Sequence, residues 1–180
     1  MVTTRNNPIF RTAGFTLLEL LVVLAIGSIL LSLGVPSFRD VIMDNRMSDQ
    51  ANAFVVSVNA ARSSAVRFQR EATICPTAGF DDAVPSCDAG ADWTDGWIVW
   101  VDKNRDAATS ANEIVSVQEP LDDTLTITTL TAESITYDAR GFSVAGGDEL
   151  LLCDNRAGEE GRLIRINGVG RTKVTRQVCL

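Results

Sequence analysis

The sequence contains no histidine, and aromatic residues make up only 6% of its 180 positions. Histidine is the usual base that activates a serine or cysteine nucleophile, so its absence removes the commonest nucleophilic mechanisms. It also argues against a zinc site, because no Cys-x-x-Cys spacing occurs to replace the missing histidine ligands. Nothing in the sequence places two of its carboxylates around a cleft. The sequence therefore predicts a protein that is not an enzyme and uses no cofactor.

Long apolar runs are absent from the chain, except for residues 15–35 near the N-terminus. This run is long enough to span the hydrocarbon core of a bilayer, which takes about 20 residues. It follows a polar leader, residues 1–14, that contains Arg5 and Arg11 and no acid. No Ala-x-Ala cleavage pattern follows the run, so we expect a retained, membrane-crossing helix. The positive leader places the N-terminus in the cytoplasm and the rest of the chain on the other side.

A second helical pattern follows this run. Between Ser37 and Arg70, apolar residues recur at helical spacing and neither glycine nor proline interrupts them. These positions are Phe38, Val41, Ile42, Ala51, Phe54, Val55, Val58, Ala61 and Ala65. We expect residues 15–36 to form a transmembrane and assembly helix and residues 37–70 an amphipathic helix. Pro36 predicts a kink between them, because proline removes an N–H and clashes with the preceding turn.

Residues 71–180 read as a β-rich globular domain outside the cytoplasm. Short alternating runs are separated by glycine-containing turns, which is typical of antiparallel hairpins. The candidate strands are residues 73–75, 97–101, 114–118, 125–129, 134–137, 150–153, 162–167 and 173–178. The predicted fold class is therefore α+β, with a long N-terminal helix packed on a small antiparallel β-domain.

All four cysteines fall in this exported part, where an oxidising compartment allows disulfides to form. They are Cys75, Cys87, Cys153 and Cys179, and three connectivities are open to them. We favour the two short loops, Cys75–Cys87 and Cys153–Cys179, because each closes a local β excursion.

The N-terminal motif resembles that of a known family. Gly14-Phe15-Thr16-Leu17-Leu18-Glu19 matches the prepilin peptidase signature of type IV pilin-like proteins, and Pro36 stands where that family has a helix-bending proline. The remainder more loosely resembles the GspH/FimT group of minor pilins and pseudopilins. The resembling segments are residues 96–102, residues 135–141 and Gly170-Arg171. Within that group, the chain most resembles FimU-like minor pilins.

The resemblance implies a processed and methylated N-terminus. Prepilin peptidase would cleave between Gly14 and Phe15, and Phe15 would become the N-methylated first residue. An unpaired Glu19 carboxylate in lipid costs about 3 kcal/mol, so a neighbouring subunit's Phe15 amine is a natural partner for it. Such a pair would fix the axial register between subunits. The alternative is that Glu19 reaches the cytoplasmic interface, about one helical turn away.

The resemblance also implies a structural function. The chain would be a minor type IV pilin in a priming or tip complex that initiates pilus assembly, for twitching motility and adhesion. Its partners would be other minor pilins, the major pilin, prepilin peptidase and the inner-membrane assembly machinery. It would cross the inner membrane once, with its C-terminal domain in the periplasm, and enter the pilus on assembly. Two alternatives stay open, a type II secretion pseudopilin of the GspH type and a DNA-binding pilin of the FimT type for natural transformation.

One loop has the ligand spacing of a calcium site. Asp102, Asn104, Asp106 and Glu113 occupy positions 1, 3, 5 and 12 of an EF-hand-like pattern. Ala107 stands where the pattern needs glycine, and the flanking segments read as strands. We therefore favour a polar hairpin loop with no metal, and calcium remains a minor hypothesis.

Basic residues gather near the C-terminus, although residues 71–154 hold 17 acids against three basic residues. The basic residues considered for DNA contacts are Arg162, Arg165, Arg171, Lys173 and Arg176. Gly170-Arg171-Thr172-Lys173 resembles the Gly-Arg-x-Arg element of DNA-binding FimT-type pilins, with lysine in the last place. Any such binding would be weak, non-specific and sensitive to salt. The alternative is that these charges protect an edge strand from association with other sheets.

Overall fold

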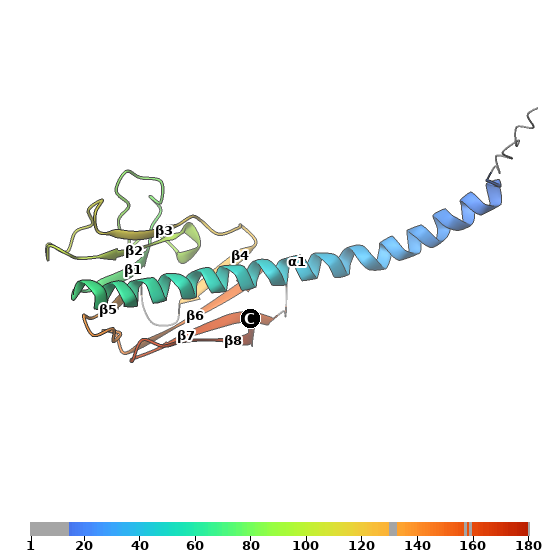
Figure 1. Ribbon diagram of the computed structural model, residues 1–180. Helices are drawn as coiled ribbons and strands as arrows, with labels where there is room; N and C mark the ends of the chain where they lie inside the picture. The colour runs from blue at the N-terminus through green and yellow to red at the C-terminus, as the bar shows by residue number, and fades with distance from the viewer. Residues whose placement is uncertain (1–14, 130–132, 157, 159, 180) are drawn as a thin grey trace, which may run out of the picture. The chain divides into compact units, whose positions relative to one another are not determined.

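The computed structural model describes residues 15–129, 133–156, 158 and 160–179. Gly14 and the rest of the predicted leader lie outside the described residues. The chain divides into two compact units, Met1–Ile42 and Met43–Leu180. One helix, α1 (Leu17–Phe68), contributes to both units (Figure 1).

In the first unit, α1 begins with an N-cap. The Thr16 hydroxyl accepts a hydrogen bond from the Glu19 backbone N–H at 3.2 Å, which satisfies one of the free donors of the first turn. The backbone is helical on both sides of Pro36, and the kink expected there stays a prediction. A membrane-crossing helix was expected over residues 15–36. Among the described residues, however, no helix meets the length and apolarity that a membrane crossing requires.

In the second unit, one apolar stripe of α1 is buried. Its buried apolar residues alternate at spacings of four and three, as a helix with a single apolar face requires. They are Met47, Ala51, Phe54, Val58, Ala61 and Ala65. The sequence pattern predicted all of these except Met47. Of the other positions in the predicted pattern, Val55 is partly buried. Phe38, Val41 and Ile42 belong to the first unit and are exposed in this chain.

Two antiparallel sheets complete the second unit. The first sheet has the order β3-β2-β1-β5 and the second has the order β4-β6-β7-β8. The strands of the first sheet are β1 (Ala72–Pro76), β2 (Trp97–Val101), β3 (Ile114–Gln118) and β5 (Ile135–Tyr137). Those of the second are β4 (Leu125–Thr129), β6 (Gly147–Asp154), β7 (Glu160–Asn167) and β8 (Thr172–Val178). The predicted α+β fold is confirmed, and the β-domain proves to be two four-stranded sheets.

The core lies where α1 meets the two sheets, and aromatic contacts mark its centre. Phe54 packs edge-on against both Trp93 and Trp97, with ring centroids 5.3 Å apart in each pair. The Trp97 indole N–H donates to the Ser57 hydroxyl at 2.9 Å, which satisfies both polar groups inside the core. Trp100 points to the other face of β2, because side chains alternate along a strand, and it is only half-buried.

Two disulfides fasten segments that are distant in sequence. Cys75 of β1 is bonded to Cys87, and Cys153 of β6 is bonded to Cys179, just beyond β8. These are the short-loop pairings that the sequence favoured. The second bond ties β8 to β6 across the intervening strand β7.

Candidate functional site

The N-terminal part of α1 presents an apolar surface that the chain itself does not cover. Phe15 is 84% exposed, and most of the large apolar side chains that follow it are exposed as well. They include Leu17, Leu18, Leu20, Leu21, Val23, Leu24, Ile26, Ile29, Leu30 and Leu31. Glu19 is exposed in the first turn, where the partial positive charge of a helix N-terminus favours an acid. Soluble monomers rarely expose apolar surface of this extent, so the segment has the character of an interaction surface.

Three arginines tie the first turns of α1 in the second unit to the β-domain. Arg46 pairs with Asp122 at 2.9 Å, and Arg162 of β7 donates to the Ser48 hydroxyl at 3.3 Å. Arg156 donates to Asp154 at 2.6 Å and to Asp44 at 2.7 Å. Hydrogen bonds from Arg156 to the Asp154 carboxylate raise the pKa of the guanidinium. These contacts hold the helix in place where the apolar stripe begins.

The basic residues near the C-terminus do not form one surface. In the β7–β8 pair, Arg162 lies opposite Arg176, and Arg165 lies opposite Lys173. Directly opposed residues share a face, and residues 162 and 165 point to opposite faces because side chains alternate along a strand. The strand pairing therefore divides the proposed DNA contacts between the two faces of the sheet.

Several of these arginines already have partners. Arg165 pairs with Glu149 of β6 at 2.6 Å, and Arg176 pairs with Glu160 at 3.3 Å. Within the described residues, the side chains of Arg171 and Lys173 have no carboxylate partner. Arg171 and Lys173 line a pocket of about 480 Å³ on the outer side of the second sheet. They are the two basic residues left available for a ligand there.

The glycine of the Gly170-Arg171 motif has a packing role. Gly170 has a φ of +76°, and a Cβ there would lie 2.5 Å from the Gly141 carbonyl oxygen and 2.9 Å from Arg62 Nε. Arg62 Nε in turn donates to the Gly141 carbonyl at 3.0 Å. Tyr137 packs in the same junction, where burial raises the pKa of its hydroxyl to about 12. Gly170 thus allows the β7–β8 turn to approach α1 and the turn after β5.

A second close approach occurs under the Cys153–Cys179 bond. Gly161 of β7 lies beneath it, and a Cβ there would be 2.6 Å from Cys179 Sγ and 2.4 Å from the Leu152 carbonyl oxygen. Only glycine leaves room for a disulfide that crosses the middle strand.

The loop between β2 and β3 uses its acids to organise its own backbone. Asp102 accepts hydrogen bonds from the N–H groups of Arg105 and Ala107, at 2.6 and 3.2 Å. Glu113 is 1% exposed and accepts from the Lys103 N–H at 2.8 Å and from the Ser110 hydroxyl at 2.5 Å. The Ser110 hydrogen bond is the main reason that the pKa of Glu113 is lowered.

The side chains of the calcium-like pattern bond within the loop, and calcium binding there stays a prediction. Throughout the described part of the chain, no three histidine, cysteine, aspartate or glutamate side chains converge as a metal site would require. Asn104 and Asp106 bond to each other, with Asn104 Nδ2 2.7 Å from Asp106 Oδ2. Together with Asp102 and Glu113, they form a polar hairpin loop.

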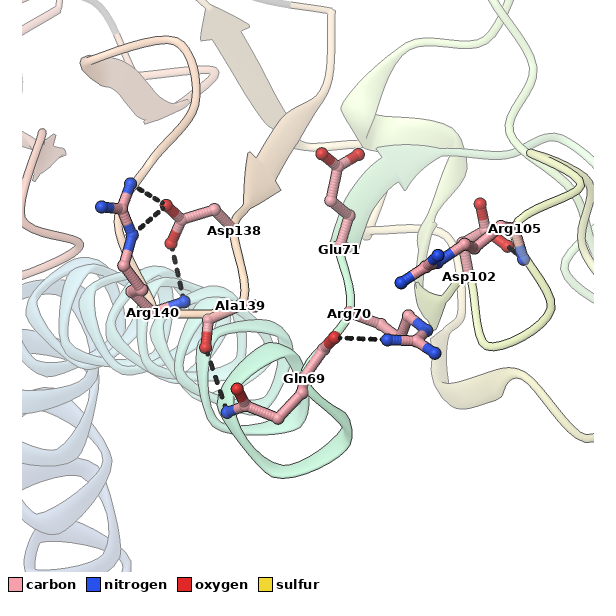
Figure 2. Close-up of a pocket in the computed structure, with 8 residues that line it drawn as sticks. All are labelled: Gln69, Arg70, Glu71, Asp102, Arg105, Asp138, Ala139 and Arg140. Carbon is pink, nitrogen blue, oxygen red and sulfur yellow. Dashed lines mark hydrogen bonds and ion pairs between the residues drawn. The ribbon is translucent and has the colours of Figure 1, made fainter.

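A pocket of about 490 Å³ lies at the C-terminal end of α1 (Figure 2). Figure 2 shows Arg140 paired with Asp138 on one side and Arg105 near Asp102 on the other. Asp138 accepts hydrogen bonds from the Phe142 and Arg140 N–H groups, and the first of these is the main reason that its pKa is lowered. These charges stabilise turns, and the residues that line the pocket include no nucleophile beside a base.

Sequence reasoning missed two features of these sites. One is Thr16, although the Thr-x-x-Glu spacing from Thr16 to Glu19 is a recognisable helix-capping signal. The other is Arg62, which sits within a predicted helix. Its contact with Gly141 depends on tertiary structure and has no local signal.

Comparison with known proteins agrees with this architecture. Residues 50–170 match the family model described as "Type II transport protein GspH", and residues 9–35 match the prokaryotic N-terminal methylation motif. Among curated proteins, none matches the chain.

Two crystal structures of the type IV minor pilin FimU from Pseudomonas aeruginosa have a similar fold. The form in space group P21 is 22% identical, with a TM-score of 0.59 over 76% of this chain and 95% of that chain. The form in P65 is also 22% identical, with a TM-score of 0.56 over 73% and 96%. Because the GspH family model covers most of its length, the chain belongs to the GspH family and is a type IV pilin-like structural subunit.

Proposed function

We propose that the chain is a minor type IV pilin that acts in a priming or tip complex to initiate pilus assembly. The exposed apolar part of α1, with Glu19 in its first turn, carries this proposal. Burying such a surface contributes roughly 25 cal/mol for each Å² removed from water, which favours lipid before assembly and other subunits after it. The match of residues 9–35 to the methylation motif supports anchoring in the inner membrane, with the second unit in the periplasm.

In this proposal, processing prepares the N-terminus for pairing. Prepilin peptidase cleaves between Gly14 and Phe15, and Phe15 is then methylated on its amino group. The new N-terminal amine carries a positive charge, four residues from Glu19 in the same chain. In an apolar bundle, the Glu19 carboxylate of one subunit and the Phe15 amine of its neighbour neutralise each other. Because breaking a buried pair costs about 3 to 5 kcal/mol, one axial register is favoured over the others.

A pseudopilin of a type II secretion system is the second candidate. The description of the matching family model, "Type II transport protein GspH", favours it. The same helix would then assemble into a short periplasmic filament. DNA uptake receives less support, because the C-terminal basic residues lie on two faces and several pair with acids.

Deletion of the gene in its native host separates the two candidates. The pilin proposal predicts loss of surface pili and of twitching motility, with secretion of type II substrates unchanged. Complementation with the unaltered gene should restore piliation. Normal piliation with defective secretion would overturn the proposal in favour of the pseudopilin.

A further inference from the structure

A second group of exposed apolar side chains lies on the globular unit itself. It consists of Val66, Phe142, Val144 and Val169, here named the end patch. Val144 is 61% exposed, and the other three are each more than a third exposed. Figure 1 shows the turn after β5 and the β7–β8 turn at the same end of this unit as the C-terminal end of α1.

Contacts beneath these side chains make the end patch continuous. The Ser143 N–H donates to the Gly168 carbonyl at 3.0 Å, which joins the segment of Phe142 and Val144 to the turn that holds Val169. Ser143 is buried, so its two neighbours point outward on the opposite side of the segment. A Cβ at Gly141 would lie 3.1 Å from Val66 Cγ2, which places the helix residue beside the same turn.

Arginines surround the end patch. The Arg140 guanidinium lies 5.4 Å from the centre of the Phe142 ring. Arg62 and Arg67 line a hollow of about 510 Å³ together with Val66. Asp138 pairs with Arg140, whereas Arg62 and Arg67 form no salt bridge among the described residues. A positive surface is unusual on a chain whose net charge is −7.

We infer that the end patch docks the acidic surface of a second pilin-like subunit. Phenylalanine and arginine are both enriched in protein interfaces relative to the rest of the surface, and the end patch combines them beside an apolar centre. The surplus of arginine selects an acidic partner and steers its approach. This inference rests on the proposed function and adds the place where one globular domain contacts the next.

A folded protein fits this surface better than DNA does. An exposed valine offers a phosphate backbone neither a positive charge nor a hydrogen bond. Burying the same side chain against another apolar surface is favourable. DNA binding would instead use cations with aromatic rings for stacking, and the end patch offers a single ring.

Photocrosslinking of the full-length protein in its native host tests the inference. A benzoylphenylalanine at position 144 or 169 probes the end patch, and one at the exposed Val84 is the matched control. We expect positions 144 and 169 to crosslink a pilin-like subunit through an acidic segment, identified by mass spectrometry, and position 84 not to do so. Arg67→Glu should reduce the yield at least tenfold, whereas Lys173→Glu, a matched reversal outside the patch, should leave it unchanged.

The variants must first be shown to fold, by the presence of both disulfides on a non-reducing gel. Reversal of the crosslinked acid to lysine should then restore the yield with Arg67→Glu. No crosslink from the end patch, crosslinks to nucleic acid, or a yield unaffected by Arg67→Glu would overturn the inference. If filaments still depend on Glu19 in that case, the docking surface fails while the proposed function stands.

Discussion

The two halves of α1 are equal in length and opposite in surroundings. Residues 17–42 belong to the first unit, and their large apolar side chains are mostly exposed. Residues 43–68 belong to the second unit, and their apolar stripe is buried, with Met47, Phe54 and Val58 each 0% exposed. The second half therefore stabilises the globular fold, whereas the first half leaves its apolar side chains uncovered by the chain itself.

The largest expected effect tests this difference directly. Phe54→Ala removes the ring that contacts Trp93 and Trp97 and should lower the free energy of unfolding by about 3 to 5 kcal/mol. Leu30→Ala, on the exposed half, should change it by less than about 0.5 kcal/mol. Chemical denaturation of the full-length protein in detergent, followed by tryptophan fluorescence, measures both. Equal losses would show that the two halves do not differ in this way.

The two disulfides are expected to stabilise the globular unit by different amounts. Replacing Cys153 and Cys179 together with serine should cost about 2 to 4 kcal/mol, because the unfolded chain regains the freedom of the closed loop. The same change at Cys75 and Cys87 should cost about 0.7 kcal/mol less, since its sequence separation is 12 rather than 26 residues. Denaturation under non-reducing conditions compares the two, and the reverse order would contradict the loop-length argument.

Gly170 tests the packing of the turn against α1. Gly170→Ala forces a left-handed backbone on alanine, which costs about 1 to 2 kcal/mol, and adds a clash with the Gly141 carbonyl oxygen. Gly146→Ala is the matched control, because Gly146 has a similar φ of +83° and a Cβ added there would meet no atom within 4 Å. We expect the Gly170 variant to lose more stability in thermal denaturation. Equal losses of stability would mean that the left-handed backbone alone, and not the close packing, requires glycine at position 170.

The smallest expected effect is local to the loop between β2 and β3. The folded state lowers the pKa of Glu113. The carboxylate therefore contributes in full to the stability of the loop above its ordinary pKa of about 4.3, and this contribution is lost as the pH falls through the lowered pKa. Amide exchange at Lys103 and Asn104 should therefore accelerate at the acid end of this range, while exchange in β7 stays slow. Glu113→Gln should remove the pH dependence, and an unchanged dependence would contradict the assignment.

Local patterns predicted the elements well. The spacing from Ala51 to Ala65 marked the buried helix face, and alternation located all eight strands to within a few residues. The division into two sheets was not predictable, because β1 pairs with β5 and β4 with β6 across long stretches of chain. No local signal specifies which distant strand completes a sheet.

The candidate sites also differ in how far local sequence predicts them. The Gly14–Glu19 motif is contiguous, so sequence alone pointed to the methylation signature that residues 9–35 match. The calcium-like spacing of the loop stays a prediction, and Glu113 accepts hydrogen bonds from backbone N–H groups that only the folded loop presents to it. The end patch had no sequence signal, since its members come from one helix and two separate turns.

Incorporation of Glu19→Val into filaments tests the assembly role of the first half of α1 most directly. Full-length protein carrying Glu19→Val, or Glu119→Val as the matched control on the globular unit, is expressed in its native host in place of the natural copy. Membrane and sheared-filament fractions are then quantified with one antibody. We predict that Glu19→Val remains in the membrane fraction and is absent from filaments, whereas Glu119→Val enters filaments normally. Normal entry of Glu19→Val into filaments would contradict the account.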